Sequence, residues 1–201
     1  SSQYGFRSLR SCALQLLDVM ETWTEWLDNG KPFDCLYYDY SKAFDSVPHE
    51  RLIMKLKAYG IDGKTLNWIQ DFLKKRTQRV VVNSSISEWQ DVTSGIPQGS
   101  VLGPTLFLIY INDIEDQIAS TIRMFADDFK LFSVVRNDNE AQQIQTDTDT
   151  LCKWSERWQM KFNAEKCHTL HYGYNNLEYD YYLTANNTRS EIKTEDSERD
   201  L

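Results

Sequence analysis

The chain has 201 residues, of which 41% are hydrophobic and 13% aromatic, and its formal net charge is −8. This length and composition indicate a globular protein with one domain or two small ones, and they exclude a disordered chain. No run of about 18 apolar residues occurs, so no membrane-spanning helix is predicted. The four cysteines are far apart and form no Cys-x-x-Cys pair. They indicate free thiols in a reducing compartment inside the cell.

The distribution of charge is more informative than the total. A negative protein is not the usual binder of nucleic acid. Residues 51–80, however, contain eight basic side chains against two acidic ones. The densest part is predicted to bind nucleic acid and comprises Lys74, Lys75, Arg76 and Arg79. The alternative is an ordinary solvated helix face.

The first half of the chain predicts three main helices and one buried strand. Apolar residues at three-to-four spacing predict a helix over 9–27, which Asn29-Gly30 ends. An aromatic and apolar run at 33–39 predicts a buried strand that ends at Asp39. Two shorter helices follow, one from Pro48 to Gly60 and one capped by Asp62.

The second half alternates strands and helices. Residues 77–83 and 86–92 predict a hairpin, and 105–118 an apolar helix. Two strands, 121–125 and 129–135, flank Ala126-Asp127-Asp128. A helix capped by Asp138 and a last strand at 167–172 precede a polar tail. The pattern predicts an α+β fold, an antiparallel sheet with helices packed on one face.

Three aspartates stand where strands end or turn. Asp39 closes the first strand, and Asp127 and Asp128 lie at the tip of the later hairpin. Carboxylates on adjacent strands are suited to hold two Mg²⁺ ions for nucleotidyl transfer. Asp128 is expected to point away from the metals or only partly toward them, because neighbouring strand residues alternate. An Asp-Asp pair by itself more often marks an ordinary turn.

The loop from Ile96 to Pro104 lies between these carboxylates in the sequence. Its glycines allow close backbone approach and its prolines stiffen it. Gln98 offers an uncharged amide that can contact a sugar or a base. The alternative is a simple turn that leads into the following helix.

These segments resemble the palm motifs of a known family. Residues 38–45, 95–104 and 125–128 are similar to the first three palm motifs of reverse transcriptases, and most closely to those of jockey-like non-LTR retrotransposons. Gly5-Phe6-Arg7 with Arg10-Ser11 resembles the segment ahead of the palm, and residues 158–166 resemble the fourth motif. The likeness covers about residues 3 to 172. Phe125 stands where the family usually has tyrosine.

The resemblance implies a role for each matching residue. Asp39, Asp127 and Asp128 would be catalytic metal ligands for two Mg²⁺ ions, with Mn²⁺ as a substitute. Phe44 would exclude a ribose 2′-hydroxyl, or serve as a core aromatic, or both. Lys166 would protonate the leaving pyrophosphate. The nucleotide-binding set would be Tyr40, Phe44, Pro97, Gln98 and Gly99.

The resemblance also implies an activity and its boundaries. Residues 1–174 would be a reverse transcriptase domain with palm and part of the fingers, and 175–201 an acidic tail toward a thumb. The expected activity is RNA-directed DNA synthesis from an RNA template, a DNA primer and deoxynucleoside triphosphates, in nucleus and cytoplasm. A fragment of this size is expected to be weak or inactive alone. The alternatives are a decayed copy that at most binds RNA, or the palm of a maturase or telomerase relative.

Overall fold

The computed structural model describes residues 2–185 and 188–197, and the chain divides into two compact units. Unit 1 comprises Ser1–Ser41 and Asp113–Leu201, and unit 2 comprises Lys42–Asn112. In the described ranges, no helix combines the length and apolar composition needed to cross a lipid bilayer.

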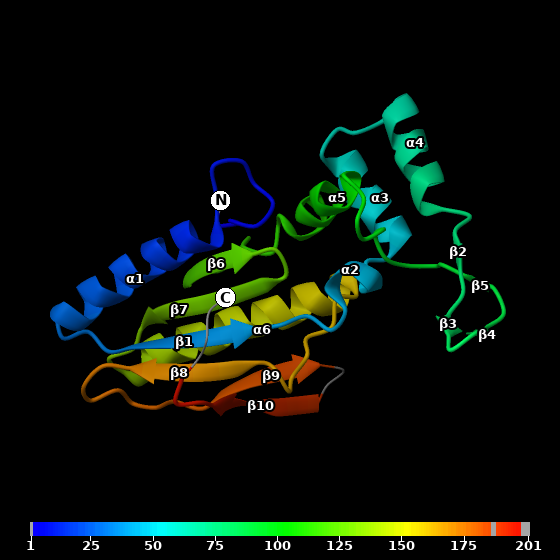
Figure 1. Ribbon diagram of the computed structural model, residues 1–201. Coiled ribbons are helices and arrows are strands. Elements are labelled where there is room, and N and C mark those ends of the chain that lie inside the picture. Colours follow the sequence, from blue (N-terminus) through cyan, green and yellow to red (C-terminus); the bar gives the residue numbers. More distant parts are fainter. Residues whose placement is uncertain (1, 186–187, 198–201) are drawn as a thin grey trace. The chain divides into compact units, whose positions relative to one another are not determined.

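Unit 1 is built on a six-stranded sheet in the order β6-β7-β1-β8-β10-β9 (Figure 1). The strand β1 (Phe33–Tyr38) lies near the middle and pairs antiparallel with both neighbours. One pair, β10 with β8, is parallel. The other strands are β6 (Thr121–Phe125), β7 (Asp128–Val134), β8 (His168–Tyr172), β9 (Tyr181–Ala185) and β10 (Thr188–Thr194).

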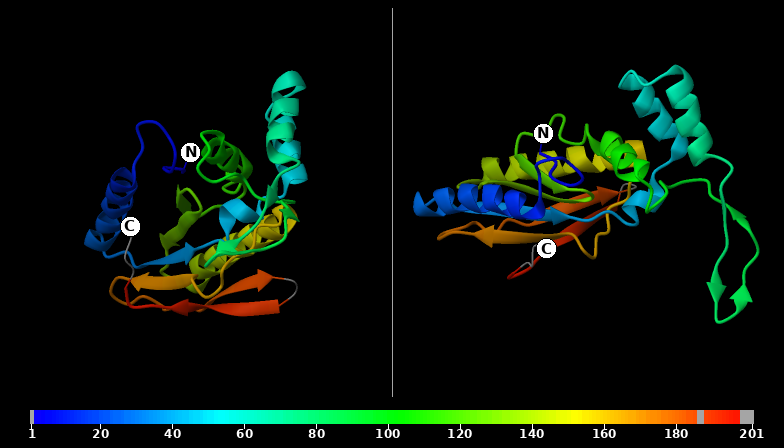
Figure 2. Two further views of the ribbon diagram at one scale, coloured as in Figure 1. Left: turned by 45° about the vertical axis from the view of Figure 1, so that its right-hand side comes forward. Right: turned by 45° about the horizontal axis from the view of Figure 1, so that its top comes forward.

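Two helices pack against this sheet (Figures 1 and 2). The helix α1 (Cys12–Asp28) contributes Trp23, which packs on Phe33 with ring centroids 5.2 Å apart. The longer α6 (Asp138–Trp158) contributes Thr148, which shares a 2.8 Å hydrogen bond with Tyr38. Residues 33 and 38 of a strand point to opposite faces, because side chains alternate. The predicted α+β class is therefore confirmed. The prediction that the helices pack on one face was wrong, because α1 lies on the face opposite α6.

The buried stripe of α1 differs from the apolar pattern in the sequence. The side chains that face the sheet are Gln15, Val19 and Trp23. Leu17 is 65% exposed and Met20 52% exposed. A helix with apolar residues on most sides offers more than one stripe at the right spacing, so tertiary packing decides which one is buried. The helix also begins three residues late, because the Ser11 hydroxyl caps the N–H of Leu14.

The strand predicted at 167–172 is present as β8, but the prediction that it is the last strand was wrong, because β9 and β10 follow it in the same sheet. Tyr181 and Leu183 alternate with polar neighbours and are buried. The Tyr181 hydroxyl donates a 2.6 Å hydrogen bond to the buried Asp34 carboxylate in β1. A strand with one solvated face contains about as many polar as apolar residues. The alternation of β9 was therefore not recognised within a segment that is polar overall.

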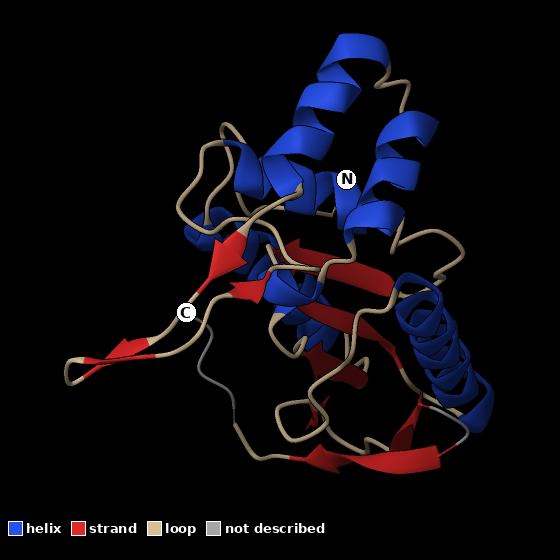
Figure 3. Ribbon diagram, turned by 90° about the vertical axis from the view of Figure 1, so that its right-hand side faces the viewer, coloured by secondary structure: helices blue, strands red, loops and turns tan. Residues whose placement is uncertain are grey.

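Unit 2 contains four helices and a narrow two-stranded arm (Figure 3). The arm consists of two strand pairs, β2 (Thr77–Gln78) with β5 (Gln90–Asp91) and β3 (Val81–Val82) with β4 (Ser85–Ile86), which bears out the predicted hairpin. Its residues are almost all exposed. The helices are α2 (Ala43–Ser46), α3 (His49–Ala58), α4 (Gly63–Leu73) and α5 (Leu102–Ile111).

Helix ends differ from the sequence prediction in two further places. The apolar helix predicted at 105–118 begins three residues earlier, at Leu102, and ends at Ile111. For α6 the capping residue is Asn137 rather than Asp138, and its side-chain oxygen accepts from the N–H groups of Asn139 and Glu140. Asn and Asp are equally good N-caps, so composition alone does not choose between adjacent ones.

Candidate active site

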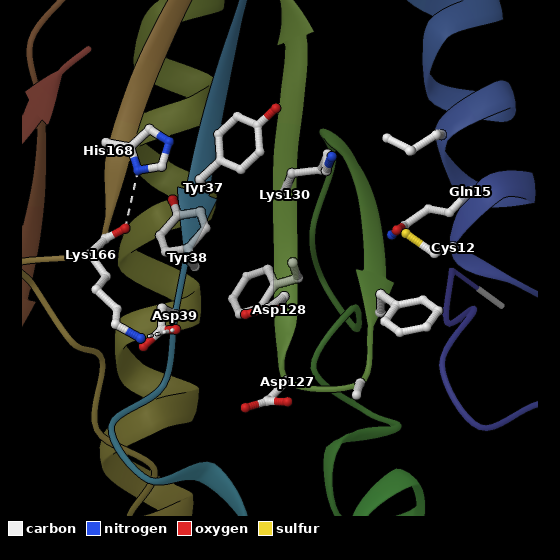
Figure 4. Close-up of a pocket in the computed structure, with 14 residues that line it drawn as sticks. Cys12, Gln15, Tyr37, Tyr38, Asp39, Asp127, Asp128, Lys130, Lys166 and His168 are labelled. Atoms are coloured by element: carbon white, nitrogen blue, oxygen red, sulfur yellow. Dashed lines mark hydrogen bonds and ion pairs between the residues drawn. The ribbon is translucent and has the colours of Figure 1, made fainter. Parts of the chain in front are cut away.

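A cavity of about 690 Å³ opens in unit 1 beside the ends of β1 and β7, and the three aspartates line it (Figure 4). Asp39 follows the last residue of β1, and Asp127 precedes the first residue of β7. The two strands are hydrogen-bonded neighbours, with Tyr38 opposite Phe129. This pairing brings together two carboxylates that are 88 positions apart in the sequence. Lys166 lines the same cavity.

Asp39 is held by the segment that leads into β8. Its carbonyl accepts a 2.8 Å hydrogen bond from the N–H of Asn163. Its carboxylate forms an ion pair with the Lys166 ammonium, with Nζ and Oδ2 3.2 Å apart. The Asp39 side chain is 22% exposed and that of Lys166 65%, so solvent screens the pair. The ion pair therefore orients the Lys166 side chain toward Asp39 and contributes little to the stability of the fold.

Asp127 lies in the tight turn between β6 and β7, and its electrostatics differ from those of an exposed aspartate. Burial raises the pKa of the Asp127 carboxyl, and the nearby negative charge of Asp39 raises it further. The Lys166 charge acts in the opposite direction. A partly buried carboxylate whose proton affinity is raised by burial and by a neighbouring negative charge marks a place where a cation is favoured.

Gln3 fixes the turn that presents Asp127, although no role for it is predicted from the sequence. Its side-chain oxygen accepts from the N–H of Ala126 at 2.8 Å and of Gly5 at 2.7 Å. Its amide nitrogen donates to the carbonyl of Ala126 at 3.1 Å. Ala126 has φ of +56°, which only the surrounding bonds make acceptable for a residue with a Cβ. The only feature of the sequence that could have pointed to Gln3 is its position two residues before the Gly5-Phe6-Arg7 motif.

Gly5 is required by this arrangement. A Cβ at this position would lie 2.3 Å from the Ala126 nitrogen. The segment that resembles the family's motif ahead of the palm therefore lies directly against the turn with the paired aspartates.

Asp128 is the most exposed of the three carboxylates and is the first residue of β7. Across residues 2–185 and 188–197, no group of three or more His, Cys, Asp or Glu side chains is arranged to hold a metal ion. Asp39 and Asp127 are the two partly buried carboxylates of the cavity, and they interact electrostatically. The metal-ligand roles of Asp39, Asp127 and Asp128 all remain predictions.

Tyr40 belongs to an aromatic cluster in the core of unit 1. Its ring is 4% exposed and stacks on Phe162 with centroids 4.7 Å apart. It also lies 5.7 Å from the ring of Phe129. The side chain therefore packs in the core, and a role in nucleotide binding would belong to its backbone.

The remaining predicted nucleotide-binding residues belong to unit 2. Phe44 is half-buried and stacks on Phe107 at 4.3 Å between ring centroids. Gln98 and Gly99 are exposed, and Pro97 is partly buried. The Gln98 amide donates a 3.1 Å hydrogen bond to the Asp45 carboxylate.

The predicted basic patch lies at the base of the arm in unit 2. Lys74, Lys75 and Arg79 are exposed, and Arg76 is partly buried. The Arg79 guanidinium lies over the ring of Trp89 at 4.6 Å from its centroid. Lys55, which also contributes to the positive charge of this region, is buried and donates to the carbonyl of Tyr110. It is thus a structural residue and does not belong to the patch.

The sheet with its carboxylates at adjacent strand ends defines the palm fold of a template-directed polymerase. Solved structures share it: telomerase from Candida tropicalis in complex with a fragment of telomeric RNA matches with a TM-score of 0.64 and 11% identity, over 87% of this chain and 31% of that one. The apo telomerase truncated from its C-terminal domain matches with a TM-score of 0.60 and 12% identity, over 91% and 38%. These likenesses show the fold.

Sequence comparison shows the family. The chain belongs to the family described as reverse transcriptase (RNA-dependent DNA polymerase), whose sequence model matches residues 1–194. It is 30% identical to the RNA-directed DNA polymerase from mobile element jockey of Drosophila melanogaster, over 82% of this chain and 19% of that protein. The probable RNA-directed DNA polymerase from transposon BS of the same species is also 30% identical, over 84% and 20%. The chain thus spans about a fifth of these relatives.

Proposed function

We propose that this chain is the palm-containing part of an RNA-directed DNA polymerase from a non-LTR retrotransposon. The observation that carries the proposal is the meeting of Asp39 and Asp127 at one cavity, with Lys166 paired to Asp39. Membership of the family supports it, as do the relatives from mobile elements. The nucleus and cytoplasm, where such an enzyme would meet its RNA, are the proposed location.

The donor set at this cavity fits divalent cations. Asp39 and Asp127 provide hard carboxylate oxygens, and the pKa of Asp127 is raised chiefly by burial and further by the charge of Asp39. Asp128 would add a third, more exposed oxygen donor. Two Mg²⁺ ions, or Mn²⁺ in their place, would activate the primer 3′-hydroxyl and stabilise the leaving pyrophosphate.

The chain's own residues would position the reactants. Asn163 holds the backbone of Asp39, Gln3 holds the residue before Asp127, and both carboxylates line the cavity. Lys166 is 65% exposed at its side chain and carries the proton that a leaving pyrophosphate needs. Its ion pair with Asp39 keeps the ammonium at the cavity between reaction cycles.

The substrates proposed are an RNA template, a DNA primer and deoxynucleoside triphosphates. Phe44 is held against Phe107, so its ring cannot swing away from a ribose 2′-hydroxyl without losing that contact. This supports its role as the residue that selects deoxynucleotides, with Gln98 and Gly99 in the adjoining loop.

The basic patch would contact the phosphate backbone. Lys74, Lys75 and Arg79 are available to phosphates, and such contacts carry affinity rather than sequence information. Their binding should weaken steeply as salt is raised.

Template dependence is the direct test of the proposed function. A DNA primer annealed to an RNA template would be incubated with one deoxynucleotide at a time, using residues 1–201 and a longer polypeptide extended at both ends. We expect the extended polypeptide to add only the nucleotide that complements the next template base, and residues 1–201 alone to be weak or inactive. Untemplated addition, or none by either protein, would contradict the proposal.

A further inference from the structure

Asp45 joins the two segments of unit 2 that are proposed to read the incoming nucleotide. It immediately follows Phe44 in α2, and it contacts the loop that contains Gln98 through both its backbone and its side chain. The Ser94 hydroxyl donates to the Asp45 carbonyl at 3.0 Å. The Gln98 amide nitrogen donates to the Asp45 carboxylate at 3.1 Å.

The loop packs closely against the backbone of α2 at Asp45. Gly95 has φ of +90°, and a Cβ there would lie 2.9 Å from the Asp45 Cα. The N–H of Gly95 donates to the carbonyl of Val47, and that of Ile96 to the carbonyl of Phe44, both at 2.8 Å. The carboxylate of Asp45 is therefore presented to Gln98 from a fixed backbone.

A carboxylate accepts hydrogen bonds and donates none, whereas an amide side chain has one accepting and one donating end. Asp45 therefore selects one of the two orientations of the Gln98 amide, with the nitrogen toward Asp45. The oxygen then points away. Among the hydrogen bonds of the described residues, none is accepted by this oxygen, and Gln98 is exposed.

We propose that Asp45 is a positioning residue that holds Gln98 as a hydrogen-bond acceptor for a hydroxyl or amino group of the incoming nucleotide. The inference rests on the proposed function, because the nucleotide is its substrate. It adds a residue outside the metal site and predicts the polarity of the contact. A Gln98 free to rotate would present its donor and its acceptor in turn, and the substrate would lose part of its binding energy.

A double-mutant cycle measured on the full polypeptide tests this coupling. KM and kcat for single-nucleotide incorporation would be determined for Asp45→Asn, Gln98→Ala and the double variant. Asn at position 45 can accept or donate, so it no longer selects an orientation. We expect Asp45→Asn to raise KM for the deoxynucleotide about tenfold with kcat within about twofold, and to change KM by less than about twofold when Gln98 is already Ala. Equal effects on both backgrounds would overturn the proposal.

A polarity swap provides a second, independent readout. Gln98→Glu places two carboxylates together and should raise KM by much more than tenfold. Adding Asp45→Asn should recover at least about threefold, because the Asn amide can donate to one oxygen of the introduced carboxylate while the other oxygen still faces the substrate. Failure of Asp45→Asn to improve the Gln98→Glu variant would overturn the proposal.

Controls separate this inference from its foundation. Asp71→Asn, the same chemical change at an exposed site of α4, should leave KM unchanged. Thermal unfolding of each variant would show that unit 2 remains folded. A parent polypeptide without templated incorporation would refute the proposed function itself. An active parent without coupling between positions 45 and 98 would refute the positioning role alone.

Discussion

The Gln3 side chain forms two hydrogen bonds with the backbone of Ala126. It accepts from the Ala126 N–H at 2.8 Å and donates to the Ala126 carbonyl at 3.1 Å. Ala126 is the residue immediately before Asp127 in the turn between β6 and β7. A buried side chain from the start of the chain thus determines where a carboxylate 124 positions away is presented. Gln3 is 5% exposed, so water cannot replace these bonds.

Gln3→Ala should destabilise the protein and weaken its proposed activity together. The change leaves the N–H groups of Ala126 and Gly5 without their acceptor in a buried place, which costs about 1–3 kcal/mol for each unsatisfied group. Urea unfolding followed by circular dichroism measures the loss. Gln142→Ala, an exposed position in α6, is the matched control and should change stability by less than about 0.5 kcal/mol. Equal stability of the two variants would show that the hydrogen bonds of Gln3 do not contribute to the stability of the fold.

Gly95→Ala and Gly99→Ala should separate steric overlap from backbone strain in unit 2. Both glycines have positive φ, +90° and +78°, so both substitutions introduce strain of about 1–2 kcal/mol. Only at Gly95 would the new Cβ also overlap, at 2.8 Å from the Asp45 carbonyl oxygen, whereas at Gly99 nothing lies within 4 Å. We expect Gly95→Ala to lower the free energy of unfolding by clearly more than Gly99→Ala. The reverse order would contradict the close packing of this loop on α2.

Asp127→Asn should stabilise the metal-free protein near neutral pH. The pKa of Asp127 is raised in the folded state, chiefly by burial, so its charged form opposes folding at pH values above that pKa. The penalty disappears as the pH falls through the folded-state pKa toward the unfolded value near 3.8. The gain from Asn should therefore be present at pH 7 and vanish in acid. Thermal melts at several pH values in a chelating buffer would show it. A destabilised variant at pH 7 would contradict this electrostatic account.

The thiols of Cys152 and Cys167 should be slow to react in the folded protein. Burial raises the pKa of both to about 11, so at pH 8 only about one thiol in a thousand is ionised. Cys12 is half-buried and lines the cavity, and we expect it to react first. Time courses of thiol modification by a disulfide reagent at pH 8, with and without denaturant, would separate the fast-reacting from the slow-reacting thiols. Four equally fast thiols in the native protein would contradict the burial of Cys152 and Cys167.

Much of the fold near the proposed site could be predicted from the sequence, because its signals are local. Strand β1 is a short aromatic and apolar run, and the hairpin that contains Asp127 consists of two apolar runs on either side of a turn. The meeting of Asp39 with Asp127 was expected from the position of each carboxylate at a strand end and from the resemblance to a family, and not from periodicity. The hydrogen bonds between Gln3 and Ala126 join positions more than a hundred residues apart, and no local sequence pattern predicts such a contact.

Other errors have the same physical origin. The sequence places Tyr181 in a polar tail, whereas in the fold its hydroxyl donates a hydrogen bond to the buried Asp34 carboxylate. The exposure of Leu17 in α1 depends on which stripe the sheet covers. In both cases tertiary contacts, absent from a local window, decide between arrangements of similar intrinsic propensity.

Single-nucleotide incorporation by the extended polypeptide, comparing the parent with Asp127→Asn, tests the central claim most directly. Asp28→Asn, at the exposed end of α1, is the matched control for loss of one carboxylate in unit 1. A group that stabilises transition-state charge typically contributes about 10²–10³-fold to the rate. We expect Asp127→Asn to lose at least about that much in kcat at saturating Mg²⁺ and RNA-primer hybrid, with the control unchanged. Undiminished incorporation by Asp127→Asn would show that the cavity between Asp39 and Asp127 is not the site of nucleotidyl transfer.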